Sequence, residues 1–476
     1  MKRRICFPAA AAILTLVAAG RVVMTYSTTA QAWDEPCHIA AGMEWVDRGT
    51  YHLDPVHPPL SRIAMGLPLF LAGVRYPAEL SSDLPSGFPL YWVVGRNLLY
   101  GDGHYLRNLS LARSGMLPFL FLASAIVFLW TRRAFGDVAA LVSVFLFTTL
   151  PIVLGFSGVA YTDIPATATQ FMALLSIALW LEKPNLKSSL FLGFAVGLAL
   201  LSKFTSLVYL PVATAGMVSC KWLLRRNDHS DHPSSPRAAV LLQRVKLISL
   251  AALIACLMVW GGYRFSFDHI VEAVGIVRQP PPTFQHFPRP LAALGRKLLI
   301  WDPKLPAVEM FNGLANLWSI THSGADAYIF GHIKSGSWWY FFLVGLGVKA
   351  PIPFLLLCIA GVFFTFKRAT EIGWAGAAPA ASLIALLMAT MFVSYDAGMR
   401  HVLLLFPLLA VVAGFGALRL WQLQSPRNFI ARALVIVLLV WQGAASYGAR
   451  ADYLAYFNEL AGKNPSRILV TGCDSE

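Results

Sequence analysis

Charged residues are scarce in this chain of 476 residues. Asp, Glu, Lys and Arg make up 13% of the sequence, while hydrophobic residues make up 57%. A soluble domain carries about 25% charged residues. The shortage of charge, together with long apolar runs, excludes a soluble globular protein and indicates a membrane protein that crosses the bilayer several times.

Cysteine is scarce as well, with six residues and no CxxC pair. Cys256 and Cys358 lie inside apolar runs and are typical of small buried hydrophobic residues. Cys37 and Cys473 would share the outer side of the membrane, but their spacing alone does not establish a disulfide.

The chain has no internal repeat, which disfavours a secondary transporter. It also has none of the common nucleic-acid-binding motifs. The formal charge of +14 instead comes from Lys and Arg residues in short loops between apolar runs. That distribution follows the positive-inside rule and points away from a nucleic-acid partner.

Apolar runs and their charged flanks predict an all-α polytopic protein with about eleven transmembrane helices. The expected helices cover residues 7–27, 112–130, 138–156, 164–181, 188–203, 205–222, 247–265, 340–364, 374–393, 401–418 and 430–447. The resulting segments are a first transmembrane helix (1–27), a first outer loop (28–111), transmembrane helices two to seven (112–265), a second large outer loop (266–339), transmembrane helices eight to eleven (340–447) and a short outer tail (448–476).

Orientation follows from the basic loops, which fall on one side when the amino end is cytoplasmic. The carboxyl end is then outside. We expect the amino-terminal apolar run to stay as a first helix that doubles as an insertion signal. Within the apolar stretch 188–222 no Gly or Pro marks a turn near Lys203, but the basic flanks require two crossings, which places Lys203 at or just below the outer surface.

The first outer loop is too long for a simple connector. Pro36–Arg48 is predicted to be a helix, with Glu35 at the cap and Gly49 past its end. Ile39, Met43 and Val46 would form an apolar stripe that lies along the membrane interface. Residues 58–71 form a second candidate interfacial helix.

Asp34 and Glu35 are adjacent carboxylates in this loop. Neighbouring side chains diverge, so one of them would face a site while the other orients or caps a helix. The alternative is that both only favour the positive end of the following helix. The sequence supports the two interpretations about equally.

Asp163 stands at the outer end of a predicted span, where it would either cap a helix before Pro165 or share a site with Asp34. Two acidic groups beside an apolar groove could supply a general base and a tuning neighbour, or ligands for a hard cation. His57, in the segment His-Pro-Pro-Leu, could bind phosphate or metal, or could pack against the prolines.

Cationic candidates gather on the same side. They are Lys203, Arg264, Arg400 and His401. An arginine at the mouth of a span can bind an anionic headgroup with its planar fork, or can extend to lipid phosphates without any further role. Asn458 and Glu459 lie in the outer tail, and their spacing alone suggests no mechanism.

These motifs resemble those of the GT-C glycosyltransferases that use a polyprenyl-phosphate sugar, the glycosyltransferase family 39-like group of protein O-mannosyltransferases and lipid A aminoarabinose transferases. The resemblance rests on Trp33–Pro36 with His38–Gly42, on Asp54–Leu60, on Tyr161–Pro165, on Gly197–Thr205, on Arg400–His401 with Pro407, and on Ala455–Gly462. Each motif is loose, but their order and spacing cover nearly the whole chain. Relatives often continue past the last motif into a further outer domain, so the short segment after Gly462 suggests a short or truncated form.

The resemblance implies an inverting transfer of one sugar to a hydroxyl acceptor on the outer face of a bacterial inner membrane. It makes Asp34 the catalytic base and Asp163 the second acidic residue of the site. Lys203 and Arg400 would hold the donor phosphate, and Glu35, His57 and His401 would bind substrate. A lipid-linked donor also explains why no soluble nucleotide-binding motif is needed.

Partners implied by this reading are a polyprenyl-phosphate-linked sugar, membrane lipids and an acceptor that is a protein hydroxyl, lipid A or another glycan. No cofactor is required when Lys and Arg hold the phosphate, although a divalent cation is the alternative. The rival functions are a transporter or flippase of a lipid-linked saccharide and a non-catalytic scaffold. A transporter should carry polar residues at mid-membrane depth, whereas the ionisable groups here lie at the outer ends of the spans.

Overall fold

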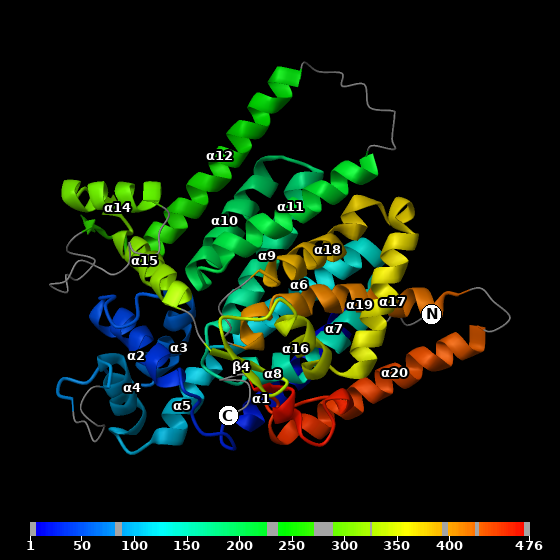
Figure 1. Ribbon diagram of the computed structural model, residues 1–476, viewed down its shortest axis with the longest axis horizontal. Coiled ribbons are helices and arrows are strands. Elements are labelled where there is room, and N and C mark those ends of the chain that lie inside the picture. Colours follow the sequence, from blue (N-terminus) through cyan, green and yellow to red (C-terminus); the bar gives the residue numbers. More distant parts are fainter. Residues whose placement is uncertain are drawn as a thin grey trace.

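The computed structural model describes residues 6–80, 88–225, 237–270, 289–323, 326–392, 398–423 and 428–470. Helices form most of this structure, as the sequence predicts, and they pack into a bundle with a smaller group of helices at one end (Figure 1). The bundle helices are α1 (Phe7–Thr25), α6 (Leu117–Phe135), α7 (Asp137–Thr148), α8 (Pro151–Ser157), α9 (Asp163–Glu182), α10 (Leu186–Ser202), α11 (Ser206–Arg225), α12 (Arg237–Gly262), α16 (Phe341–Lys349), α17 (Ile352–Lys367), α18 (Ala369–Thr390), α19 (Leu405–Trp421) and α20 (Asn428–Gly448).

Seven helices in the described part of the chain are long and apolar enough to cross a membrane, or nine if each of two bent pairs forms one span. Two further apolar helices, α10 and α19, coincide with the predicted spans at 188–203 and 401–418. Each predicted span therefore has a helical counterpart. The break between α10 and α11 falls at residues 203–205, where the flanking charges required a turn.

Two predicted spans are bent rather than straight. The axes of α7 and α8 differ by 64°, and those of α16 and α17 by 120°. In each case the break lies at a residue that precedes a proline, Leu150 or Ala350, and that residue has an extended conformation. A proline ring disfavours helical geometry in the residue before it, which accounts for both bends.

Residues 28–111, called loop 1 from here on, fold into four helices and a short π-helix. They are α2 (Glu35–Met43), η1 (Glu44–Arg48), α3 (Pro59–Leu71), α4 (Leu90–Tyr100) and α5 (Tyr105–Ser114). The predicted helices at 36–48 and 58–71 are thus present, although Asp34 rather than Glu35 occupies the N-cap position of α2.

Helix α2 does not expose the predicted apolar stripe. All of its residues are buried, and it packs between α3 and α4. Small residues make this possible, since a Cβ atom at Gly42 would lie 2.2 Å from the carbonyl oxygen of Arg62, and one at Gly95 would lie 2.1 Å from that of Pro36. The small residues on the far side of the predicted apolar stripe allow α2 to be covered on both faces.

Residues 266–339, called loop 2, contain the larger part of the β structure in the described chain. The elements are β1 (Phe267–His269), α14 (Arg289–Trp301), β2 (Lys304–Pro306), α15 (Val308–Ser323), β3 (Asp326–Ile329) and β4 (His332–Ser335). Strand β1 pairs with β2, and β3 lies between β4 and the tail strand β5 (Leu469–Val470), all antiparallel. Short 3-10 helices complete the structure at η3 (Met399–Val402), η4 (Ala449–Ala451), η5 (Glu459–Ala461) and η6 (Pro465–Arg467).

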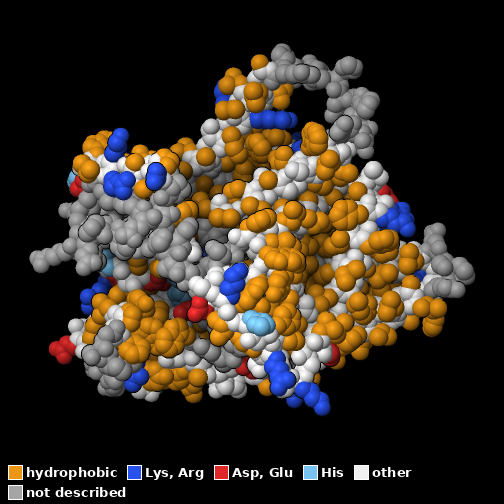
Figure 2. All heavy atoms as spheres, viewed as in Figure 1, with side chains coloured by type: hydrophobic (Ala, Val, Ile, Leu, Met, Phe, Trp, Pro, Cys, Tyr) orange, Lys and Arg blue, Asp and Glu red, His pale blue; other side chains and the backbone are white. Residues whose placement is uncertain are grey.

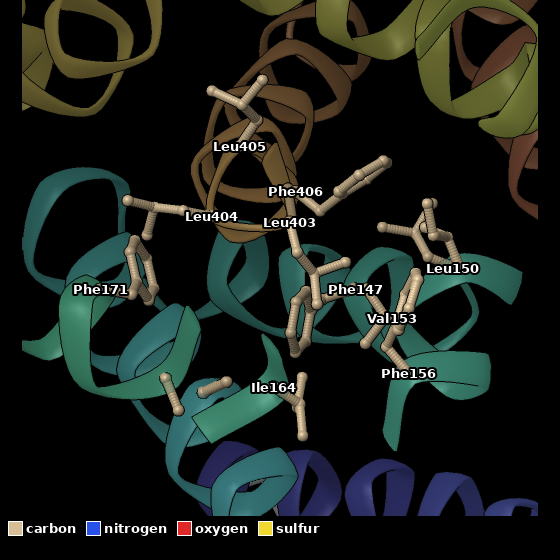
Figure 3. Close-up of a cluster of buried hydrophobic side chains, with 14 of the residues drawn as sticks. Phe147, Leu150, Val153, Phe156, Ile164, Phe171, Leu403, Leu404, Leu405 and Phe406 are labelled. Carbon is tan, nitrogen blue, oxygen red and sulfur yellow. The ribbon is translucent and has the colours of Figure 1, made fainter. Parts of the chain in front are cut away.

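A cluster of buried hydrophobic side chains joins the centre of the bundle to the segment that follows η3 (Figure 3). Leu403 and Leu404 face Phe147 of α7 and Phe171 of α9, and Ile164 lies in the same cluster. This packing fixes the chain directly after Arg400 and Asp163. The outer surface of the bundle is largely hydrophobic (Figure 2), as expected for helices in contact with lipid.

Several sequence-based expectations fall outside the described residues. They concern the basic amino-terminal residues 2–4, the polar linker up to Pro236 and the partner of Cys37 in a disulfide, Cys473. These expectations stay predictions.

Candidate active site

Asp34 lies in loop 1 at the start of α2, where the chain meets the end of the bundle. Its side chain makes no capping hydrogen bond to α2. Instead, its Oδ2 atom accepts a hydrogen bond of 2.7 Å from Nη1 of Arg400. The capping interpretation of Asp34 is therefore wrong for its side chain.

Arg400 reaches Asp34 from η3, which is 366 positions away along the chain. The exposed fractions of the Arg400 and Asp34 side chains are 17% and 28%, so the ion pair is accessible from outside the protein. A partly exposed ion pair between a guanidinium and a carboxylate can exchange its partners for a ligand.

A second ion pair joins Asp163, the first residue of α9, to Lys203, which follows α10. Nζ of Lys203 lies 2.6 Å from Oδ1 of Asp163, and the exposed fractions of the two side chains are 12% and 2%. Thr162 rather than Asp163 occupies the cap position of α9. An acidic and a basic candidate thus contact each other directly at this end of the bundle, a pairing that the sequence did not predict.

Tyr161 connects the two ion pairs. Its hydroxyl oxygen accepts a hydrogen bond of 3.2 Å from the main-chain N–H of Asp34. The guanidinium of Arg400 lies 5.4 Å from the centre of its ring, and the ring of His38 packs edge-on against it at 5.9 Å. Since Tyr161 precedes Asp163 by two residues, it fixes loop 1 against the start of α9. Asp34, Asp163, Lys203 and Arg400 therefore belong to one site.

Glu35 does not share this site, although the sequence made it a substrate-binding candidate. Its side chain is fully buried and forms a double hydrogen bond with Arg113, with distances of 2.8 and 2.7 Å. The carboxylate also accepts hydrogen bonds of 2.7 Å from the main-chain N–H groups of Ala32 and Ala160. These contacts leave no surface for a substrate, so the structure gives Glu35 a structural role and corrects the prediction.

His57 belongs to a cluster with His38 and Asp54 beside Asp34. Nδ1 of His57 lies 3.0 Å from Oδ2 of Asp54, and Nδ1 of His38 lies 3.4 Å from the same oxygen. The rings of the two histidines are 4.7 Å apart. Arg62 donates hydrogen bonds to the carbonyl oxygens of Asp54 and His57, which holds this segment on α3.

The carboxylates of Asp34 and Asp54 stay ionised. Burial raises the pKa of Asp34, but His38 and Arg400 face the carboxyl and bring the pKa below its ordinary value. Burial also raises the pKa of Asp54, yet His57 and His38 hold it well below the usual range. Burial lowers the pKa of His38, so that its imidazole is neutral near pH 7.

The remaining candidates are placed as follows. His401 adjoins Arg400 in η3, and its carbonyl oxygen accepts a hydrogen bond of 2.8 Å from Tyr209. A substrate-binding role for its imidazole stays a prediction.

Arg264 donates to the carbonyl of Trp45 and stacks over the Trp45 ring. Asn458 donates to the carbonyls of Gly347 and Ala350, at 2.6 and 2.7 Å, which makes it a cap for α16.

Sequence reasoning missed four residues. His38, Asp54 and Tyr161 surround Asp34, whereas Arg113 pairs with the buried Glu35 outside the site. The first three stand inside motifs that the resemblance used, and two spacings contained a signal. His38 follows Asp34 by four positions on a helix, and Asp54 precedes His57 by three, so each pair lies on one face of a turn.

Comparisons with known proteins bear on the fold and on the class of protein. Residues 115–260 match the family described as dolichyl-phosphate-mannose-protein mannosyltransferase. No curated protein matches the chain in sequence. Among solved structures, ArnT from Cupriavidus metallidurans bound to undecaprenyl phosphate is 13% identical, with a TM-score of 0.53 over 92% of this chain and 71% of that one.

The oligosaccharyltransferase of Archaeoglobus fulgidus in the apo form is 14% identical, with a TM-score of 0.55 over 96% of this chain. Another structure of the archaeal oligosaccharyltransferase, AglB in complex with an inhibitory peptide and a dolichol-phosphate, has the same identity and TM-score over 95% of this chain. The chain spans 56% of the length of either oligosaccharyltransferase chain. The protein described here therefore has the polytopic helical fold of the GT-C glycosyltransferases.

Proposed function

We propose that this protein is an inverting glycosyltransferase that moves a sugar from a polyprenyl-phosphate donor to a hydroxyl acceptor on the outer face of the membrane. The observation that supports it most is the pairing of two carboxylates with two cations, Asp34 with Arg400 and Asp163 with Lys203, at one end of an apolar bundle. The family match and the GT-C fold support the same class of reaction.

The reaction needs a base on one side of the anomeric carbon and positive charge on the other. Asp34 takes the proton of the acceptor hydroxyl as the new bond from oxygen to the anomeric carbon forms. The bond from that carbon to the phosphate oxygen breaks, and its electron pair leaves with the polyprenyl phosphate. Lys203 and Arg400 stabilise the charge that the phosphate gains.

The Asp34–Arg400 contact suggests an order for these events. An arriving donor phosphate competes with Asp34 for the guanidinium of Arg400, because both are anions that suit its planar fork. Donor binding would thereby loosen Arg400 from Asp34 and release the carboxylate to act as a base. In this scheme Asp163 keeps Lys203 oriented towards the phosphate.

The proposal is tested by sugar transfer from defined polyprenyl-phosphate donors in detergent-solubilised protein. Replacing Asp34 with Asn removes the base and keeps the shape of the side chain. We expect transfer to fall by a factor of about a hundred or more, which is the contribution of a positioned general base. Release of polyprenyl phosphate and covalent product are measured together, since a transporter would yield neither.

A matched control is Asp102→Asn, which changes an exposed carboxylate of the same loop. This variant should transfer sugar as the wild type does. Retained transfer in Asp34→Asn would refute the assignment of the base. Absence of both products from every donor class, in protein that stays folded, would refute the glycosyltransferase and favour a carrier of lipid-linked saccharide.

A further inference from the structure

Three side chains with metal-binding atoms meet beside Asp34. His38 extends from α2, whereas Asp54 and His57 stand in the segment between η1 and α3. One ligand atom from each residue lies within 4.8 Å of the others. No other group of three His, Cys, Asp or Glu residues with this spacing occurs in the described part of the chain.

The spacing suits a tetrahedral ion. Metal–ligand bonds of about 2.0 to 2.2 Å imply ligand atoms roughly 3.3 to 3.6 Å apart. Oδ2 of Asp54 lies 3.0 Å from Nδ1 of His57 and 3.4 Å from Nδ1 of His38, which approximates two edges of such a tetrahedron. Both histidines therefore face the same carboxylate oxygen from a distance that an ion can bridge.

The state of the ligands also favours metal binding. The side chain of His38 is 5% exposed, and its Nδ1 makes no hydrogen bond of acceptable geometry in the described structure. A buried polar atom without a partner normally has an explanation, and a missing ion is one.

The surrounding contacts hold the ligands in place. Arg62, which is fully buried, donates to the carbonyls of Asp54 and His57, and the hydroxyl of Tyr51 donates to the same carbonyl of His57. The Arg62 guanidinium lies 3.7 Å from Oδ2 of Asp54. Fixed backbone around two ligands is the kind of support that orients a metal site.

We propose that His38, Asp54 and His57 form a binding site for one divalent transition-metal ion, with zinc as the preferred ion. Two of the three ligand atoms are imidazole nitrogens, whereas magnesium and calcium prefer oxygen. The exposed fraction of His57 is 29%, against 9% for Asp54 and 5% for His38, so the ion enters and keeps an open position on the His57 side. The site lies outside the phosphate-binding pair proposed above and does not depend on the proposed transfer.

The ion would have a positioning role. His38 is four positions after Asp34, at the start of the same helix, so an ion on His38 ties the segment 54–57 to the element that carries Asp34. Its charge also lies near the Asp34 carboxylate. Removing the ion should therefore loosen loop 1 without removing any group from Asp34, Asp163, Lys203 or Arg400.

The test measures bound metal in full-length protein purified with an affinity tag that contains no histidine. Protein stripped with a chelator is titrated with zinc, and bound zinc per chain is determined by elemental analysis. Cobalt substitution then reports tetrahedral geometry through its visible absorption. We expect about one ion per chain in the wild type, and affinity at least about tenfold lower in His57→Ala and Asp54→Asn.

The control is His52→Ala, which removes an exposed histidine of the same loop that lies outside the cluster. It should bind zinc as the wild type does, and so should Asp34→Asn, even though that variant loses transfer. Zinc binding and sugar transfer are thereby tested independently, so failure of the metal site can be told apart from failure of the proposed function. Zinc binding that is absent in the folded wild type, or that persists unchanged in His57→Ala and Asp54→Asn, would overturn the proposal and leave the three side chains as a hydrogen-bonded group.

Discussion

Two adjacent carboxylates in loop 1 have different surroundings. Asp34 is partly exposed and pairs with Arg400, whereas Glu35 is buried and pairs with Arg113. Adjacent side chains at the start of a helix diverge by about 100°, so two residues of similar chemistry can serve separate purposes. This divergence leaves Asp34 as the only one of the two that a substrate can reach.

The pKa of Asp34 predicts a pH effect on transfer. Burial alone raises this pKa, while His38 and Arg400 lower it below the ordinary value, so the carboxylate is ionised and able to accept a proton well into the acidic range. Arg400→Gln removes one of the three groups that lower this pKa, which are His38, Arg400 and His57, so the pKa of Asp34 should rise. Since a base acts only when deprotonated, the residual transfer of Arg400→Gln should fail at a higher pH than that of the wild type.

The measurement is kcat/KM for transfer as a function of pH on the acid side. Arg450→Gln, which changes an exposed arginine of η4, is the control and should keep the wild-type profile. An acid limb at the same pH in Arg400→Gln and wild type would mean that Arg400 does not tune Asp34.

At this scale the sequence predicted which residue types gather, but not how they pair. Asp34, Asp163, Lys203 and Arg400 were all candidates, and the structure brings them to one end of the bundle. The partner of Asp34 lies 366 positions away, and no local pattern encodes so distant a contact. The burial of Glu35 depends on its pairing with Arg113, another distant residue. The sequence alone therefore could not distinguish a structural role of Glu35 from a role in binding substrate.

The buried pair of Glu35 and Arg113 also fixes the position of helix α2. Glu35 is the first residue of α2, and Arg113 stands near the end of α5, so their double hydrogen bond fixes the start of α2. Glu35→Gln leaves the Arg113 charge buried without its counter-charge. We expect this change to lower the stability of the protein by about 3 to 5 kcal/mol.

Thermal unfolding in detergent checks this expectation. Asp34→Asn breaks an ion pair that is partly exposed, and such a change costs about 1 kcal/mol or less. Glu35→Gln should therefore unfold at a clearly lower temperature than Asp34→Asn. Equal melting temperatures for the two variants would argue against a structural role for Glu35.

Helix positions were predictable because each span is a long apolar run, but bends and burial were not. The span at 340–364 divides at Ala350 because Pro351 follows it, a local signal that apolarity masks. The helix at 36–48 has an apolar stripe that suits an interface. Its burial instead depends on close contacts at Gly42 and Gly95, which involve helices elsewhere in loop 1.

For the whole molecule, Asp163 of the candidate site and the basic segment that follows α9 lie at opposite ends of that helix. Helix α9 begins at Asp163 and ends at Glu182, and its 20 residues span about 30 Å, the thickness of the hydrocarbon core. Glu182 pairs with Arg133 at the far end, next to the predicted cytoplasmic loop that holds Lys183 and Lys187. Because cytoplasmic loops carry the excess of Lys and Arg, the end with Asp163 is expected to face outward.

Cysteine labelling in intact cells tests this orientation. In a background without the native cysteines, single cysteines replace His52 in loop 1 and Lys187 in the first turn of α10, which are both exposed. A membrane-impermeant thiol reagent should label His52→Cys in intact cells, whereas Lys187→Cys should react only after the membrane is opened. This contrast is expected because the positive-inside rule places loop 1 outside and the start of α10 in the cytoplasm. Labelling of Lys187→Cys in intact cells, with His52→Cys protected, would place the site on the cytoplasmic face and remove the lipid-linked donor of the outer leaflet from the proposed reaction.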